Sequence, residues 1–280
     1  MKTLQQNMFL ELKVQEAIVN IKKFAHIAQL EDLNLELGFS GGKDSIVIYH
    51  LTKLANIKFT PIFNYAFEDM DIVNFIKQNY PDIQIHKKPT HYLKLIQQTK
   101  LLPSQQIRYC CTYYKEQSQN AIITGVRRYE SRGRQNRKLF GIKYKKNTKK
   151  YNDIFISECT EQSQNKLMLR PIINWKDTDV WQYIYQNKLP YPNIYNQGQK
   201  RCGCMLCPLA TLDHNIFYFK KKPALINFAK KIAEFSDLTI KKTNKKYTAE
   251  QYIFVWLNHF KEPSEKQKQT INNIYNRIIF

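Results

Sequence analysis

The chain has 280 residues, of which 43% are hydrophobic and 13% aromatic, a composition typical of a globular protein and not of a disordered one. It contains no apolar run of membrane-spanning length, and its first residues lack the apolar core of a signal peptide, so we expect no membrane association and a cytoplasmic location. A formal net charge of +21 favours a polyanionic partner such as nucleic acid, although a lysine-rich composition shared by all proteins of the source would give the same charge.

The first sixty-odd residues alternate between helix-like and strand-like patterns. Residues 9–28 have the spacing of an amphipathic helix, which we expect to pack on the domain that follows. Its apolar positions are Phe9, Leu12, Ile18, Ile21 and Phe24. Strand patterns at 33–39 and 59–66 flank a helix pattern at 46–57, which predicts a βαβ unit with parallel strands and a right-handed crossover.

The alternation continues to about residue 126. Helix patterns cover 71–81, 92–101 and 107–117, and strand patterns cover 83–88 and 121–126. This order predicts an α/β fold with a doubly wound, mostly parallel sheet. Ligands of such sheets bind beyond the carboxyl ends of the strands, where the stretches SGGKDS and RRYESRGR are expected to lie.

The rest of the chain divides into a basic segment and a helical extension. Residues 127–150 are rich in lysine and arginine with Glu130 as their single acid, and we expect much of this segment to be a loop. Lysine-rich helical patterns follow Pro208. The predicted organisation is an N-terminal helix at 1–30, a nucleotide-binding domain at 31–210 and a helical C-terminal extension at 211–280.

The stretch SGGKDS lies between the first predicted strand and the following helix. It consists of Ser40, Gly41, Gly42, Lys43, Asp44 and Ser45. A glycine turn at a helix N-terminus directs several backbone N–H groups at one point, which is a cradle for phosphate, and the lysine adds charge. The alternative is an ordinary turn with a serine cap. The spacing differs from that of the common P-loop, which disfavours a kinase or GTPase.

This stretch resembles the PP-loop of the ATP pyrophosphatases, the adenine nucleotide α-hydrolase-like enzymes. Four further stretches, in the same order, resemble the phosphoadenosine phosphosulfate (PAPS) reductase branch of that group. They are RYCCTYYK at 108–115, GVRRYESRGR at 125–134, RPIINWKDTDVWQYI at 170–184 and LPYPNIYNQGQKRCGCMLCP at 189–208. One departure is NYAFEDMD at 64–71, where many relatives have an acidic DTG sequence that contacts the adenosine or the substrate.

The resemblance implies roles for several of these residues. Residues 40–45 would bind the phosphates of ATP, of PAPS or of adenosine phosphosulfate, with Lys43 and Asp44 also acting in catalysis. Arg127 and Arg132 would neutralise the transferred or leaving anion, and Glu130 would position the substrate or a Mg²⁺ ion. Arg134, Arg137 and Lys138 are expected to form a solvated basic face.

Five cysteines lie in two groups and are candidate metal ligands. They are Cys110, Cys111, Cys202, Cys204 and Cys207. Four thiolates suit either a [4Fe–4S] cluster or a zinc ion, and the resemblance favours the cluster. Cys111, Cys204 and Cys207 match the family elements; the fourth ligand is Cys110 or Cys202, with a slight preference for Cys202. Cys159 is expected to be a buried filler.

Sulfonucleotide reductases attack sulfate with a cysteine in a C-terminal E-C-G-L/I-H element, and no cysteine follows Cys207 in this sequence. The expected function is therefore ATP-dependent sulfur transfer to DNA or tRNA, as in the DndC-like sulfurtransferase relatives, with a cysteine desulfurase as a candidate sulfur donor. The alternatives are a reductase that releases sulfite and draws on an electron donor, and a non-catalytic nucleotide- or nucleic-acid-binding module.

Overall fold

The computed structural model describes residues 2–116, 121–143, 166–235 and 248–275. Within these ranges the chain forms two compact units. Unit 1 contains residues 1–64, 70–86 and 116–202, and unit 2 contains residues 65–69, 87–115 and 203–280. Segments from the middle of the chain thus belong with the C-terminal helices, and the boundaries predicted after residues 30 and 210 stay predictions.

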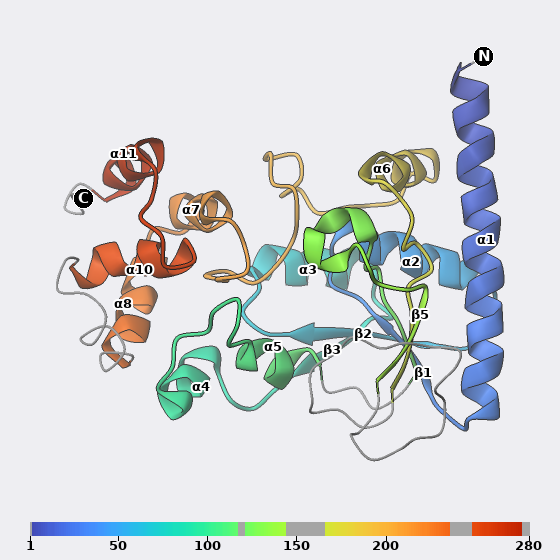
Figure 1. Ribbon diagram of the computed structural model, residues 1–280, viewed down its shortest axis with the longest axis horizontal. Helices are drawn as coiled ribbons and strands as arrows, with labels where there is room; N and C mark the ends of the chain where they lie inside the picture. The colour runs from blue at the N-terminus through green and yellow to red at the C-terminus, as the bar shows by residue number, and fades with distance from the viewer. Residues whose placement is uncertain (1, 117–120, 144–165, 236–247, 276–280) are drawn as a thin grey trace. The chain divides into compact units, whose positions relative to one another are not determined.

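A six-stranded sheet in the order β3-β2-β1-β4-β6-β5 organises the first unit (Figure 1). The strands are β1 (Leu35–Gly38), β2 (Thr60–Tyr65), β3 (Gln84–Lys87), β4 (Ala121–Ile123), β5 (Phe140–Lys143) and β6 (Lys166–Leu169). β1 pairs in parallel with β2 and β4, and β4 pairs in parallel with β6. The prediction of an α/β fold with a mostly parallel sheet is confirmed.

The edge strand β5 was not predicted. It pairs antiparallel with β6, with Phe140 opposite Leu169 and Lys143 opposite Lys166. Within the segment 127–150, much of which was expected to be a loop, residues 140–143 thus form a strand, and the short helices η1 (Arg128–Glu130) and η2 (Arg132–Arg134) precede it. Residues 144–150 lie outside the described residues. The strand was missed because the segment is rich in basic residues, which we read as a sign of a loop. An edge strand, however, also accepts charged side chains.

Helices α1 (Lys2–Leu30), α2 (Lys43–Leu54), α3 (Met70–Asn79) and α6 (Asp177–Gln186) belong to the same unit. The long helix α1, blue in Figure 1, packs on α2 and β6. Its buried stripe is Leu10, Val14, Ala17, Ile21, Phe24 and Ala28. The predicted helix is confirmed, but its apolar face differs, because Phe9 and Leu12 are exposed.

Unit 2 is helical. Its helices are α4 (Tyr92–Thr99), α5 (Tyr109–Tyr114), α7 (Leu212–Lys221), α8 (Leu225–Phe235), α10 (Ala249–Leu257) and α11 (Glu265–Ile274). α8 packs against α4 and α10, and α7 against α11. The buried Trp256 anchors α10 by donating a hydrogen bond from Nε1 to the carbonyl of Pro103 at 2.7 Å. None of the helices in the described ranges is long and apolar enough to cross a membrane.

Candidate phosphate loop and thiol group

The phosphate loop follows β1 at the carboxyl edge of the sheet. The backbone of Phe39 still pairs with Ile62 at 2.8 Å, after which the chain turns sharply and enters α2 at Lys43. The Ser45 hydroxyl donates to the carbonyl of Gly42 at 2.7 Å and lies 3.2 Å from the hydroxyl of Ser40. These bonds hold the turn in one conformation at the positive end of the helix dipole, as an anion cradle requires.

Gly41 is required by the local geometry, and Gly42 leaves space beside the backbone of the loop. Gly41 has a φ of +74°, and a Cβ there would lie 2.9 Å from Cγ2 of Ile72 on α3. Gly42 is extended, and a Cβ there would lie 3.2 Å from the hydroxyl of Tyr195. Side chains at either position would fill the space that the loop keeps for close approach to its backbone.

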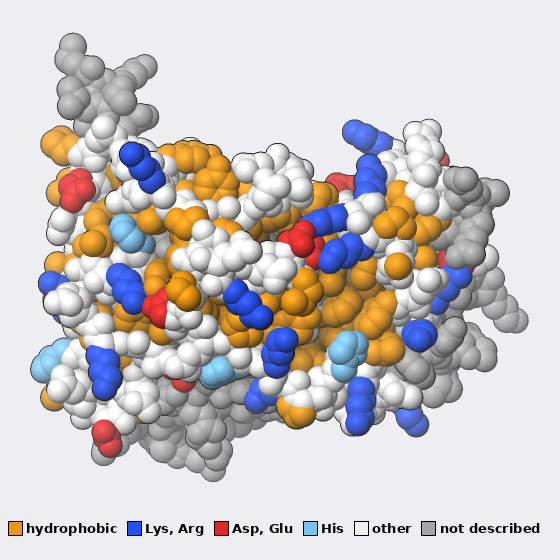
Figure 2. Space-filling view, turned by 180° about the vertical axis from the view of Figure 1, so that it is seen from behind, with side chains coloured by type: hydrophobic (Ala, Val, Ile, Leu, Met, Phe, Trp, Pro, Cys, Tyr) orange, Lys and Arg blue, Asp and Glu red, His pale blue; other side chains and the backbone are white. Residues whose placement is uncertain are grey.

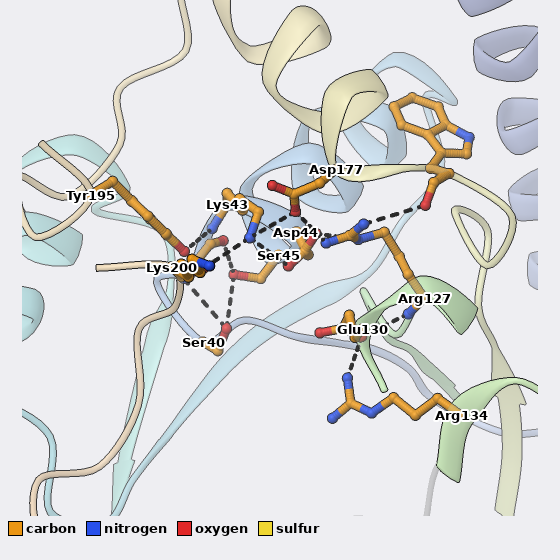
Figure 3. Close-up of polar contacts among 12 residues, drawn as sticks. Ser40, Lys43, Asp44, Ser45, Arg127, Glu130, Arg134, Asp177, Tyr195 and Lys200 are labelled. Carbon is orange, nitrogen blue, oxygen red and sulfur yellow. Dashed lines mark hydrogen bonds and ion pairs between the residues drawn. The ribbon is translucent and has the colours of Figure 1, made fainter. Parts of the chain in front are cut away.

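Four charged side chains converge at this loop, as Figure 3 shows. Nε of the buried Arg127 lies 2.6 Å from Oδ1 of Asp44, and its Nη2 lies 2.9 Å from Oδ1 of Asp177. The ammonium of Lys43 is 3.2 Å from the same Asp177 oxygen and 3.9 Å from Asp44. A third Arg127 bond, from Nη1 to the carbonyl of Trp175, fixes the guanidinium. Two buried cations therefore face the first turn of α2.

The network shifts the pKa values of its members. Burial raises the pKa of the Asp44 carboxyl, although Arg127 and Lys43 oppose that shift. Burial acts to lower the pKa of Arg127, but the attraction of Asp44 raises it, so the guanidinium remains charged. Burial acts to raise the pKa of Asp177, but Lys43 and Arg127 hold it below its usual value. The Arg127 guanidinium and the Asp177 carboxylate therefore stay charged side by side at the loop.

A loop from the last family element covers the turn. The hydroxyl of Tyr195 accepts a hydrogen bond from the backbone N–H of Lys43 at 2.9 Å, and the Lys43 ammonium donates to the carbonyl of Lys200 at 3.1 Å. A Cβ at Gly42 would lie 3.7 Å from the Cβ of Cys202, and burial raises the pKa of the Cys202 thiol while Tyr195 acts to lower it. Cys202 therefore belongs to the phosphate loop in unit 1.

The predicted residues after β4 have different surroundings. Glu130 accepts a hydrogen bond from the backbone N–H of Arg127 at 2.8 Å and forms an ion pair with Arg134. Arg134, expected on a solvated basic face, has a side chain that is 35% exposed and pairs with Glu130. The side chain of Arg132 is exposed on η2. Glu130 thus orients the backbone that carries Arg127.

Four cysteine thiols lie in unit 2. Cys110 and Cys111 are on α5, and Cys204 and Cys207 are on the segment before α7. The thiol of Cys110 interacts electrostatically with Cys111, Cys204 and Cys207, and a hydrogen bond between the two adjacent thiols raises the pKa of Cys110 and lowers that of Cys111. Two segments about ninety residues apart thus bring four sulfur donors into one neighbourhood.

The acidic residues of NYAFEDMD are inside the same unit. Oε1 of the buried Glu68 lies 2.6 Å from the ammonium of Lys115 and accepts a hydrogen bond from the Cys204 thiol at 3.3 Å. Asp69 is also buried and pairs with Lys221 at 2.8 Å. Burial raises the pKa of Cys204 to about 12. The departure from DTG therefore supplies buried carboxylates beside a thiol.

Among the residues that the structure describes, no group of three or more His, Cys, Asp or Glu side chains is arranged to hold a single metal ion. Four thiols from two segments are a donor set that either an iron–sulfur cluster or a zinc ion could use. Cys159 lies outside the described residues.

Two residues of the phosphate site were not predicted from the sequence. Asp177 falls between the fixed positions of WKDTDVW, and only its place at the first turn of α6 brings it to Lys43 and Arg127. Tyr195 is the second tyrosine of LPYPNIY, and its hydroxyl contact depends on a loop path that the pattern does not specify. Both residues could have been proposed as site residues because they lie within stretches that resemble the family elements.

The comparisons agree with these observations. The phosphoadenosine phosphosulfate reductase domain matches residues 34–210. An uncharacterized protein of Methanocaldococcus jannaschii is 28% identical over 203 residues, which cover 68% of this chain and 45% of that protein, so the chain spans less than half of that relative. An adenosine 5'-phosphosulfate reductase of Oceanobacillus iheyensis is 26% identical over 181 residues, which cover 62% of this chain and 71% of that enzyme.

Among solved structures, the crystal structure of phosphoadenylyl-sulfate (PAPS) reductase from Candida auris in a phosphate complex is similar over 66% of this chain and 87% of that chain. Its sequence identity is 17% and its TM-score is 0.43.

Proposed function

Because this chain belongs to the phosphoadenosine phosphosulfate reductase family, we propose that residues 40–45 bind the phosphates of ATP or of a sulfonucleotide and that the chain uses this nucleotide in sulfur transfer to nucleic acid. The observation behind the proposal is that Lys43 and Arg127, both buried, face the N-terminus of α2 beside a glycine turn. Backbone N–H groups and two fixed cations form a site for a polyphosphate.

The residues have separate tasks in this reaction. An acceptor oxygen attacks the α-phosphorus of ATP, its bond to that phosphorus forms, and the bond to the β-phosphate oxygen breaks as pyrophosphate leaves. The ammonium of Lys43 and the guanidinium of Arg127 stabilise the charge that gathers on the leaving group. Asp44 holds Arg127 in place at 2.6 Å, and Glu130 fixes its backbone. A Mg²⁺ ion would reduce the charge of the phosphates further.

We assign the [4Fe–4S] cluster to Cys110, Cys111, Cys204 and Cys207. Cys110 interacts electrostatically with Cys111, Cys204 and Cys207, whereas the Cβ of Cys202 lies beside Gly42 of the phosphate loop, so we propose Cys110 in place of Cys202 as the fourth ligand. A bound cluster would supply sulfur or electrons to the reaction; zinc on the same thiols remains the alternative. Burial raises the pKa of the Cys204 thiol, and the charge of Lys115 acts to lower it, which favours the thiolate form that ligation requires.

A nucleic-acid acceptor agrees with the charge of the chain. Figure 2 shows scattered lysine and arginine side chains on one face, with fewer acidic side chains among them and much uncharged and apolar surface between. Distributed charge of this kind supports sequence-independent contact with phosphates, and DNA and tRNA are both candidates. The proposal includes a sulfur donor such as a cysteine desulfurase and a cytoplasmic setting, as for DndC-like sulfurtransferases.

The second candidate function is reduction of adenosine phosphosulfate or PAPS with release of sulfite. It is favoured by the relatives named adenosine 5'-phosphosulfate reductase, at 26% identity. An electron donor replaces the sulfur donor in this reaction. The third candidate, a binding module without turnover, shares the same phosphate loop.

The first test uses protein purified without oxygen and incubated with ATP, PAPS or adenosine phosphosulfate. We expect pyrophosphate release from ATP that increases with added DNA or tRNA, and we expect Lys43→Ala to weaken ATP binding about tenfold, because a buried charge-assisted contact is lost. Calorimetry measures the binding. Sulfite release would favour the reductase instead, and binding without turnover would favour the module.

The second test concerns the cluster ligands. We expect Cys110→Ser to lose most of the iron and labile sulfide of the wild type, whereas Cys202→Ser keeps them, because Cys202 lies beside Gly42 of the phosphate loop and Cys110 interacts with the other three thiols. Iron and sulfide analysis with visible absorbance measures both variants. Loss of iron from Cys202→Ser with full retention in Cys110→Ser would reverse the assignment, and zinc in place of iron would refute the cluster.

A further inference from the structure

Groups of the chain itself already occupy the donors of the phosphate loop. The backbone N–H of Lys43 is the first amide of α2, and it donates to the hydroxyl of Tyr195 at 2.9 Å. The ammonium of Lys43 donates to the carbonyl of Lys200 at 3.1 Å and pairs with Asp177 at 3.2 Å. Each acceptor is an oxygen atom at a position where a phosphate oxygen would bind the same donor.

Asp177 has the contacts of an anion bound at this site. One of its carboxylate oxygens lies 2.9 Å from Nη2 of Arg127 and 3.2 Å from Nζ of Lys43, so it joins the two cations assigned to the nucleotide (Figure 3). Its side chain is 59% exposed, unlike those of its two partners. An exposed carboxylate holds such partners weakly, and a polyphosphate with several negative charges competes well against it.

Tyr195 blocks the backbone side of the same site. Its hydroxyl would lie 3.2 Å from a Cβ at Gly42, so it fills the space that the glycine leaves open. Its ring packs edge-on against Trp181, with the ring centroids 5.0 Å apart, and the ammonium of Lys43 lies 5.5 Å from the centre of the ring. A phosphate oxygen and this hydroxyl cannot accept from the Lys43 amide in the same place.

We infer that Tyr195 and Asp177 are internal competitors of the nucleotide: phosphate binds by displacing the hydroxyl from the Lys43 amide and the carboxylate from Lys43 and Arg127. The displacement sets the affinity of the site and moves the Tyr195 ring relative to Trp181. This inference rests on the proposed binding of nucleotide phosphates at residues 40–45. It adds that two side chains of the covering elements regulate that binding.

Two substitutions remove the competing groups while keeping their shape. Tyr195→Phe keeps the ring and deletes the hydroxyl, and Asp177→Asn keeps the size and deletes the charge. We expect both to bind inorganic pyrophosphate and ATP more tightly than the wild type, by about two- to tenfold for Tyr195→Phe and about two- to fivefold for Asp177→Asn. Calorimetry at fixed ionic strength measures the affinities. Tyr191→Phe is the matched control, because its hydroxyl contacts Asn196 instead of the loop, and its affinity should be unchanged.

A second readout follows the movement directly. Pyrophosphate should change the tryptophan fluorescence of the wild type, and Trp181→Phe should remove most of that change, because Trp181 is the tryptophan in contact with Tyr195. Unchanged or weaker binding by both Tyr195→Phe and Asp177→Asn would overturn the inference, since the two groups would then be neutral or direct ligands. If Lys43→Ala binds pyrophosphate as well as the wild type, the proposed phosphate site itself is wrong.

Discussion

Replacing Arg127 by methionine should destabilise the protein by about 3 kcal/mol and abolish measurable ATP binding. The side chain of Arg127 is 3% exposed and bonds Asp44, Asp177 and the carbonyl of Trp175. Methionine fills a similar volume but leaves Asp44 without its nearest counter-charge, and burial already raises the pKa of that carboxyl. The loop would lose both a proposed phosphate contact and the ion pair between Arg127 and Asp44 that holds it in place. Urea denaturation and calorimetric ATP titration measure the two effects.

Arg134→Met is the matched control for this prediction. Arg134 also pairs with a carboxylate, that of Glu130, but its side chain is 35% exposed, and an exposed ion pair contributes only about 0–1 kcal/mol. The contrast separates a buried cation of the phosphate site from a basic residue at its rim. Equal destabilisation by the two substitutions would contradict the special place given to Arg127.

The organisation of the fold could be predicted from the sequence because its signals are local. β1 alternates between buried and half-buried residues, and the glycine turn follows it directly, so the strand, the loop and the helix are each encoded within a few neighbouring residues. β5 and β6 could not be predicted in this way. Each is a four-residue strand with one lysine, too short to show a clear alternation of apolar and polar residues. Their pairing also joins segments that are separated in the sequence.

The sequence predicted most of the residues of the site, but not all of the contacts among them. Lys43, Asp44 and Arg127 were named from family elements, and the structure brings them together at the first turn of α2. The pairing of Asp177 with both cations depends on how α6 packs against α2, which is a tertiary property. The sequence also could not divide the cysteines, because the position of Cys202 beside Gly42 and the contact of Cys204 with Glu68 depend on the path of the loop that carries them.

Gly41→Ala should be the most damaging single-methyl change in the phosphate loop. Its φ of +74° is strained for any residue with a Cβ, and the added carbon would lie 2.9 Å from Cγ2 and 3.1 Å from Cδ1 of two α3 isoleucines, Ile72 and Ile76. Both isoleucines are fully buried, so α3 has little room to yield. We expect a loss of about 2–4 kcal/mol in the free energy of unfolding from strain and overpacking together.

The same change should also weaken ATP binding, because the amides of residues 42 and 43 follow the distorted turn directly and would no longer point at the phosphate. Gly133→Ala supplies the comparison: a Cβ there meets no atom within 4 Å, and we expect unchanged stability and unchanged ATP affinity. Denaturation curves and ATP titrations of the two alanine variants measure the difference. If Gly41→Ala behaved like Gly133→Ala, the turn would be more pliable than its packing on α3 implies, and a preformed cradle for phosphate would no longer account for nucleotide binding.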